Sequence, residues 1–340
     1  MKKIFVTVCL FVLLKQNVSA QDPHFSQFFS SPLTLSPAFT GKFDGNVRVT
    51  ADYRNQWPTI NNAFTTTTAS VDLHLLPKKI PYNDTWGIGF MGYNDNSAAG
   101  AVNFNYFSVS TAYHKGLDED GYHQLGVGLQ VTYANMMIYT NKLTFEDQLT
   151  TVGFTGTTQD IAALDGKNLK SNYMDVNAGV LYSGSTNDNN NFYLGVSLYH
   201  INKPKQQFTG ALFELNPRAT IHAGGYFPIN GDNNIFLHLS GIQTFQGAAK
   251  ETVVGGALQF AIGRTEETDG VSVYLGSWAR LGDAIIPYAG LEFNNFRFGA
   301  TYDVNTSSLK TASQGIGGVE FSLVYIFRRS THKPIPCPKF

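Results

Sequence analysis

The sequence predicts an all-β fold: a transmembrane antiparallel β-barrel of about 14 strands, with an N-terminal arm and a short C-terminal periplasmic tail. From residue 46 onward, segments of roughly ten residues place apolar side chains at every second position, the period of a strand with one apolar face. These segments exceed the mode of about 5–6 residues in globular sheets and suit a tilted bilayer crossing. Aromatic residues, 14% of the chain, recur at the strand ends, where interfacial girdles lie in such barrels.

Composition excludes several other classes of protein. Charged residues are 14% of the chain, against about 25% in an ordinary soluble domain. The 24 Lys and Arg nearly balance the 25 Asp and Glu, so the basic excess of a nucleic-acid binder is missing. The aromatic content argues against a disordered chain. After the first twenty residues, no apolar run approaches the roughly 18 residues of a membrane-spanning helix.

Residues 1–20 have the features of a secretory signal peptide. Lys2 and Lys3 precede an apolar run over 4–14, and the small residues 18–20 form a cleavage site. The mature chain is therefore expected to begin at Gln21. Cleavage would remove Cys9 and leave Cys337 as the only cysteine, which predicts a fold without an intramolecular disulfide.

Residues 21–45 form an arm before the first predicted strand. The arm is polar and aromatic and contains Pro23, Pro32 and Pro37, so it cannot be one regular strand or helix throughout. Two uses remain open for it: filling the lumen of the barrel or docking a partner on the periplasmic side. Its length and its aromatic content favour the lumen.

The barrel is predicted to span residues 46–330. Leu125, Leu129 and Tyr133 share one face of a strand whose other face is glutamine or glycine. The longest connections, 135–171 and 202–217, are both odd-numbered, which predicts that they face outward and that both termini are periplasmic. The girdle aromatics would be Trp86, Tyr93, Tyr113, Tyr133, Tyr199, Phe227, Phe245, Trp278 and Phe327.

Several inward positions of these strands are charged and of mixed sign. They are Arg48, Asp52, Asp72, Asp175, Arg218, Glu292, Arg297, Asp303 and Glu320. Buried charges require partners, so the sequence favours a lumen closed by ion pairs. An open aqueous pore remains possible at this barrel size.

Residues 331–340 form a tail with prolines at 334, 336 and 338, which forbid continuation of the sheet. The tail is expected to lie outside the barrel and to make a periplasmic contact.

No motif in the chain predicts catalysis, a cofactor or a metal ion. Gly87, Gly89 and Gly92 match a nucleotide-binding glycine pattern, but they lie in a predicted strand that no helix follows. These glycines are expected to relieve crowding on the lumen side or to let the strand bend. The acidic run 118–121 is interpreted as a hairpin turn rather than a calcium loop. We therefore expect a non-enzymatic protein.

Four stretches carry a resemblance to a known family. Residues 21–28, 36–41, 53–58 and 336–340 resemble the PorP/SprF family of outer-membrane proteins of the type IX secretion system of Bacteroidetes. Ser36 stands where that family commonly has asparagine. The resemblance extends over the mature chain in architecture and is most specific in the first forty mature residues.

The resemblance implies an outer-membrane protein that supports export or surface attachment of large secreted proteins, such as gliding adhesins. It also implies contacts with periplasmic lipoproteins and membrane lipids, and none with nucleic acid. Candidate partner-binding residues come from the matching stretches: Asp22, Pro23, His24, Phe25, Gln27, Phe28, Arg54, Gln56, Trp57, Pro336, Cys337, Pro338 and Phe340. A stand-alone porin or small-molecule transporter is the alternative.

Overall fold

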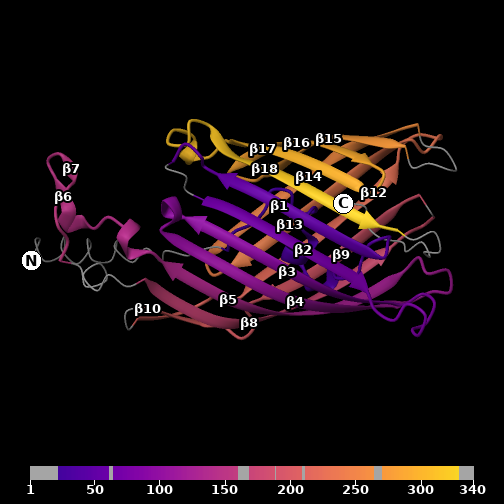
Figure 1. Cartoon of the computed structure of the whole chain (residues 1–340). Helices are drawn as coiled ribbons and strands as arrows, with labels where there is room; N and C mark the ends of the chain where they lie inside the picture. Colours follow the sequence, from indigo (N-terminus) through magenta and orange to yellow (C-terminus); the bar gives the residue numbers. More distant parts are fainter. Residues whose placement is uncertain are drawn as a thin grey trace, which may run out of the picture.

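Fourteen antiparallel strands close into a barrel in the computed structural model, which describes residues 22–60, 64–159, 168–187, 189–208, 211–263 and 270–328 (Figure 1). Each strand pairs with its neighbour in sequence, and β1 closes the barrel by pairing with β18 from Val47↔Phe327 to Gln56↔Gly318. The predicted fold class and strand number are confirmed.

The barrel strands are β1 Val47–Gln56, β2 Phe64–His74, β3 Thr85–Ser97, β4 Val102–Gly116, β5 Gln124–Ile138, β8 Leu169–Gly184, β9 Asn191–Tyr199, β12 Arg218–Pro228, β13 Ile235–Gln246, β14 Ala249–Ile262, β15 Val271–Arg280, β16 Ala284–Phe293, β17 Phe296–Asn305 and β18 Ile316–Phe327. Two small hairpins lie outside the barrel wall: β6 Leu149–Thr150 with β7 Gly153–Phe154, and β10 Lys205–Phe208 with β11 Ala211–Glu214. The helical elements are short: α2 Pro32–Leu35, η1 Pro37–Phe39, η2 Ala98–Gly100, η3 Thr140–Lys142, η4 Glu146–Gln148 and η5 Ser308–Lys310.

Alternation along the strands separates a polar inner face from an apolar outer face. In β5, Gln130 is 1% exposed inside the barrel, whereas its neighbour Leu129 is 56% exposed outside. An outer surface with so many exposed apolar side chains requires an apolar surrounding, as in a membrane barrel. No helix among the described residues is long and apolar enough to cross a membrane.

Three of the expected girdle aromatics face inward instead. Tyr93, Tyr199 and Trp278 lie on the lumen side, and Trp278 is 3% exposed. Tyr199 is the last residue of β9 and Trp278 lies near the end of β15, as predicted, whereas Tyr93 lies inside β3. The predicted outer face was wrong for all three, because an aromatic side chain can serve either an interface or the lumen. The remaining candidates lie on the outer face, where Tyr113 and Tyr133 are exposed and Trp86 and Phe227 are partly exposed.

The two ends of the barrel differ. We call the end with the odd-numbered connections, including 139–168 and 200–217, the loop end, and the other the turn end. The connection after β5 is shorter than the expected 135–171, because β5 continues to Ile138 and β8 already begins at Leu169. Both small hairpins belong to the loop end, and the one formed by β6 and β7 projects far from the barrel (Figure 1).

Residues 22–46 lie inside the barrel and run from the loop end to the turn end. At the loop end Asp22 bonds to Gln246, the last residue of β13, whereas at the turn end the Asn46 N–H donates to the Phe327 carbonyl (2.7 Å). The described chain therefore begins at one end of the barrel and finishes, at Arg328, at the other. This differs from the expectation that the arm and the tail share the periplasmic side.

Glycines on the inner face make room for the arm. A Cβ on Gly87 would lie 2.6 Å from the Gly41 Cα, and one on Gly128 would lie 2.4 Å from the Pro37 carbonyl carbon. Gly41 itself has φ +71°, which other residues rarely adopt. The expectation that Gly87 relieves crowding on the lumen side is confirmed, and the crowding partner is the arm.

Candidate functional site

The arm folds into two short helical turns because proline starts each of them. Pro32 opens α2 and Pro37 opens η1, where the missing proline N–H costs no hydrogen bond. The Ser36 hydroxyl accepts a hydrogen bond from the Ala38 N–H and caps the second turn. The arm is thus compact, and its apolar residues Leu33, Leu35 and Phe39 are buried.

A buried contact holds the first turn of the arm to β18. The backbone N–H groups of Ser26 and Gln27 both donate to the Glu320 carboxylate, each at 2.7 Å. The Gln27 side chain donates to the Glu320 carbonyl (3.2 Å) and accepts from the Ser322 hydroxyl (2.7 Å). All four residues are buried, so these bonds form away from water, where an unmade bond is costly.

Two arginines complete this contact. Arg54 pairs with Asp303 (2.9 Å) and Glu320 (3.0 Å), and Arg280 pairs with Asp303 (3.1 Å). Both guanidinium groups also donate to the Ser26 hydroxyl, which in turn donates to Asp303. We call Ser26, Gln27, Arg54, Arg280, Asp303 and Glu320 the inner clamp. Its charges are compensated, as buried charges must be.

Aromatic packing surrounds the middle of the arm. Phe29 lies 4.6 Å from the Trp278 ring and 5.4 Å from the Tyr288 ring, centroid to centroid. Further along, Phe39 makes an edge contact with Tyr193 (5.4 Å). Together these rings join the arm and the barrel wall into one apolar cluster.

A second charged contact fixes the arm at the turn end. Arg48 pairs with Asp72 (2.8 Å), and the Gly41 N–H donates to the same carboxylate (2.8 Å). The Lys42 ammonium donates to Gln124 (2.6 Å). These bonds lie where the arm turns into β1, so they fix the point at which the chain enters the barrel wall.

The loop-end contact is built around Asp22. Its carboxylate lies 2.8 Å from His200 Nε2, 3.4 Å from an Arg218 nitrogen and 3.0 Å from the Gln246 amide. His200 Nδ1 in turn lies 3.0 Å from Asp175. We call Asp22, Asp175, His200, Arg218 and Gln246 the outer latch.

The latch shifts the protonation of its own groups. Burial alone would lower the pKa of His200, but hydrogen bonds to Asp175 and Asp22 outweigh burial and raise this pKa to about 9. Burial alone would raise the pKa of Asp22, but Arg218 and His200 lower it well below its usual range. At neutral pH the latch is therefore an ion pair between a carboxylate and two cations.

The pKa of His24 is lowered, whereas that of His200 is raised. It lies 3.1 Å from Glu251, yet burial and the nearby arginines of the inner clamp lower its pKa to about 4. Burial is the largest cause of this shift, and the Glu251 charge opposes it. The ring is therefore neutral at pH 7.

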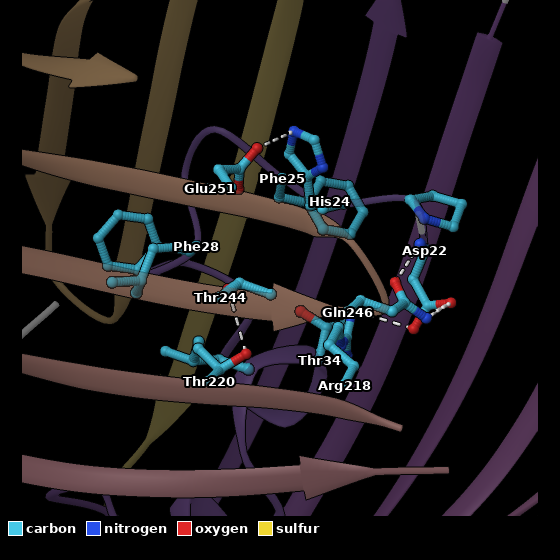
Figure 2. A pocket seen from close by; sticks show the side chains of 14 residues that line it. Asp22, His24, Phe25, Phe28, Thr34, Arg218, Thr220, Thr244, Gln246 and Glu251 are labelled. Carbon is cyan, nitrogen blue, oxygen red and sulfur yellow. Dashed lines mark hydrogen bonds and ion pairs between the residues drawn. The ribbon is translucent and has the colours of Figure 1, made fainter. Parts of the chain in front are cut away.

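Residues 22–24 divide the loop end of the lumen into two chambers. One lies against β12, β13 and β14 and measures about 630 Å³, and the other lies against β3, β4, β5 and β8 and measures about 490 Å³. Both volumes include space that is open to solvent. Figure 2 shows the first chamber, with His24 facing Glu251 and Asp22 facing Gln246. Both chambers share Asp22, Pro23 and Arg218 in their walls.

The structure brings together most of the candidate partner-binding residues, but inside the lumen. Phe25, Gln27, Phe28 and Arg54 are 4% exposed or less and contact the barrel, so an external partner cannot reach them while the arm is in place. Asp22, Pro23 and His24 line the chambers. Gln56 and Trp57 lie apart from these, partly exposed at the loop end of β1. Pro336, Cys337, Pro338 and Phe340 lie outside the described residues.

Sequence reasoning did not single out His200, Glu251 and Arg280. His200 directly follows the last residue of β9, and its backbone has φ +58°. The inward positions of Glu251 and Arg280 could have been found from the alternation of β14 and β15. Of the nine inward charges that were expected, Arg48 pairs with Asp72 and Arg297 with Glu292 across neighbouring strands.

The remaining motifs have structural roles. Asp118 accepts hydrogen bonds from the N–H groups of Tyr122 and His123, which fixes the expected hairpin turn. Among the described residues, no group of three or more His, Cys, Asp and Glu side chains is arranged to hold a metal ion.

A family comparison identifies a membrane protein. A family model described as "Type IX secretion system membrane protein PorP/SprF" matches residues 17–325. A search of curated proteins finds no match. Similar solved structures include a mutant of the TodX monoaromatic hydrocarbon channel (TM-score 0.49, 10% identity, 86% of this chain and 93% of that one). The toluene transporter TodX of Pseudomonas putida (0.47, 9%, 90% and 95%) and the NanC porin (0.41, 10%, 83% and 100%) are also similar.

Proposed function

Because the chain belongs to the PorP/SprF family of type IX secretion system membrane proteins, we propose that it is a non-enzymatic barrel that holds specific large secreted proteins, such as adhesins, at the cell surface. In this proposal the barrel resides in the outer membrane with its loop end outside, since long connections of such barrels face outward. The turn end then faces the periplasm.

The filled lumen is the observation that carries this proposal. The arm is bound by the inner clamp, by the aromatic cluster and by the Arg48–Asp72 pair, at three heights of the barrel. A folded or extended secreted protein has no passage beside a bound arm. A role in holding the exported protein therefore fits better than a role in conducting it.

The two hairpins at the loop end are the proposed contact for the exported protein. Leu149, Val152 and Phe154 of the first hairpin are 58%, 80% and 53% exposed, and Leu212 and Phe213 of the second are 53% and 56% exposed. Apolar side chains concentrated on two projecting hairpins favour a protein partner over solvent. Each hairpin is a separate two-stranded sheet, and a strand of the partner would extend it by pairing with an outer edge.

Replacing Leu149, Val152 and Phe154 together by serine tests this contact. We expect surface-exposed cargo, measured by labelling of intact cells and mass spectrometry, to fall severalfold while barrel insertion, measured by heat-modifiable gel mobility, is unchanged. Leu309→Ser, which removes an apolar side chain from another loop-end connection, is the matched control. Unchanged surface cargo in the triple variant would contradict the proposal.

Periplasmic lipoproteins of the same machinery are the proposed partners at the turn end, where residues 331–340 would meet them. Deletion of 331–340 should reduce export of at least one cargo with barrel insertion intact. Capture of the protein from mild detergent through a tag in the connection 139–168 should recover a secretion-system lipoprotein or a large secreted protein in near-stoichiometric amount. Export that persists for every cargo would exclude the tail as a docking element.

A stand-alone porin or transporter is the alternative function. The two loop-end chambers support this alternative, because they leave space in the lumen beside the arm. Planar-bilayer conductance separates the two functions. A closed lumen predicts little steady conductance for the intact protein and a large increase after deletion of residues 22–31. A large steady conductance of the intact protein would favour the porin.

A further inference from the structure

The chamber against β3, β4, β5 and β8 has the features of a ligand site. Its space of about 490 Å³, part of which is open to solvent, is walled by polar and aromatic side chains, the mixture that small-molecule sites use to orient a ligand. Tyr93, Tyr106 and Tyr199 stand in its wall, so we call it the tyrosine cavity. It lies at the loop end of the arm, on the opposite side of Asp22 and Pro23 from the first chamber.

Polar atoms without a partner line the tyrosine cavity. Asp175 is 3% exposed, and its Oδ1 has no hydrogen-bond partner, although its Oδ2 pairs with His200. The Tyr93 hydroxyl and Arg218 Nε are also buried without a partner. Buried polar groups normally have hydrogen-bond partners. Here the Asp175 oxygen lacks a donor, the Arg218 nitrogen lacks an acceptor and the Tyr93 hydroxyl lacks both, which indicates a ligand that both donates and accepts hydrogen bonds.

An aromatic track leads to these atoms. Phe104 and Tyr106 lie on the inner face of β4 with their rings parallel to within 3° and their centroids 6.1 Å apart. Phe104 is nearer the loop end, and Tyr93 makes an edge contact with Tyr106 (5.4 Å) on the cavity side. All three rings are partly exposed, so their surfaces are available for stacking.

The charges around the tyrosine cavity are already paired with one another. Asp22 faces His200 and Arg218, and Asp175 faces His200. An anionic or cationic ligand would have to break one of these pairs, whereas a neutral ligand would not. The ligand indicated is therefore uncharged, rich in hydroxyl groups and flat enough on one side to stack on an aromatic ring.

We propose that the tyrosine cavity binds a neutral sugar residue, such as the terminal hexose of a glycan. The aromatic track would guide the sugar ring from the loop end, and Tyr93, Asp175 and Arg218 would bind its hydroxyls. A glycan of the surrounding lipid and a glycan on an exported protein present the same terminal chemistry.

Binding of methyl hexosides to the full mature protein in detergent tests this proposal. We expect methyl glucoside, galactoside or mannoside to bind, measured by saturation-transfer NMR and calorimetry, and glucuronate and glucosamine to bind more weakly. Tyr93→Phe keeps the ring and removes one hydroxyl, so it should weaken the Kd about fivefold. Tyr106→Leu should weaken it by a similar factor. Tyr193→Phe, on the inner face of β9 beside Phe39 and outside the cavity wall, is the control and should leave the Kd unchanged.

Two results would overturn the proposal. The first is that no hexoside binds at tens of millimolar to protein whose fold is verified by heat-modifiable mobility, or that Tyr93→Phe binds as well as the parent. The second is that a neutral tetrapeptide binds in a Tyr93-dependent manner while the hexosides do not, which would assign the cavity to a peptide. If hexosides bind, oligosaccharide released from lipopolysaccharide and a glycopeptide from a secreted protein identify the natural source by their relative affinities.

Discussion

The inner clamp and the outer latch hold the same arm in different ways. In the clamp, Glu320 and Asp303 bind backbone N–H groups, a hydroxyl and two arginines, all buried. In the latch, Asp22 is 21% exposed and depends on His200, which titrates. An anchor made of arginine and carboxylate is fixed over the ordinary pH range, whereas a histidine anchor can open. The arm should therefore detach from its loop end first.

The largest expected effect follows from breaking the clamp. Arg54→Ala leaves the buried carboxylates of Asp303 and Glu320 with one cation fewer, a change that typically costs about 3–5 kcal/mol. We expect a markedly lower unfolding temperature, measured by heat-modifiable gel mobility, and protease access to the arm. The double variant Arg54→Met with Glu320→Met removes one charge of each sign and should recover part of the loss. Unchanged stability of Arg54→Ala would show that the clamp does not hold the arm.

Crowding the arm from the barrel wall should have a smaller effect. Gly87→Ala places a Cβ 2.6 Å from the Gly41 Cα, a backbone contact that cannot yield easily. Overpacking of this kind costs about 1–3 kcal/mol. Gly92→Ala on the same strand meets nothing within 4 Å and is the matched control. Equal unfolding temperatures for the two variants would mean that the arm does not lie against β3.

The pH dependence of the latch separates it from the clamp. Because the folded pKa of His200 is raised to about 9, its stabilisation is complete below pH 6.5 and is lost as the pH rises through 9. A charge-assisted pair of this kind contributes about 2 kcal/mol. In a Cys337→Ser background, we expect the maleimide labelling rate of Thr34→Cys, divided by that of the exposed reference Thr155→Cys, to rise between pH 7 and pH 10. The division cancels the ordinary increase of thiolate with pH. His200→Gln should abolish the rise of this relative rate, and a relative rate independent of pH in the parent would exclude the latch.

His24 makes the stability of the arm depend on pH in the opposite direction, at low pH. Its folded pKa of about 4 lies below its ordinary value, so the arm loses stability as the pH falls from 6.5 toward 4, where only the unfolded chain takes up the proton. The labelling rate of the same cysteine relative to the exposed reference should therefore also rise below pH 6. His24→Gln should remove the acidic limb alone and leave the alkaline limb of His200.

The smallest expected effect comes from a single hydrogen bond to the middle of the arm. Ser197 donates to the Leu35 carbonyl at 2.8 Å, and Ser197→Ala leaves that carbonyl unpaired at a cost of about 1 kcal/mol. Ser277→Ala, on the outer face of β15, should cost nothing measurable. A loss in Ser197→Ala as large as that in Arg54→Ala would mean that the arm is held by many equal contacts rather than by a dominant clamp.

Much of the fold was predictable because alternation is a local signal. Each strand shows its own inner and outer face, so the strand number, the long odd-numbered connections and the inward charges followed from the residues in order. Strand ends were less predictable: β5 and β8 run past the expected bounds, and Asn135 and Asn172 there face outward and bond to each other at 2.6 Å. Amides at strand ends resemble loop residues in sequence, although here they continue the ladder.

The candidate site was less predictable because its contacts join distant parts of the chain. The bond from Ser26 to Glu320 spans 294 positions, and the one from Asp22 to Gln246 spans 224. The local sequence around one residue of such a pair does not identify the other residue. The sequence indicated only that inward charges need partners. His200 was missed as a site residue because a lone histidine in a connection carries no pattern.

By itself, the sequence determined a barrel of about 14 strands with an apolar outer face, a polar inner face and a proline-containing arm whose length and aromatic content favour the lumen. The sequence also shows the inner-face glycines, but it does not show what occupies the space that they leave. Only the tertiary structure decided that the arm runs through the lumen to the loop end, that Gly87 and Gly128 make room for it, and that Arg54 faces the arm rather than an external partner. The physical reason is that alternation fixes the side of each residue, whereas closure of the barrel fixes which inward residues meet.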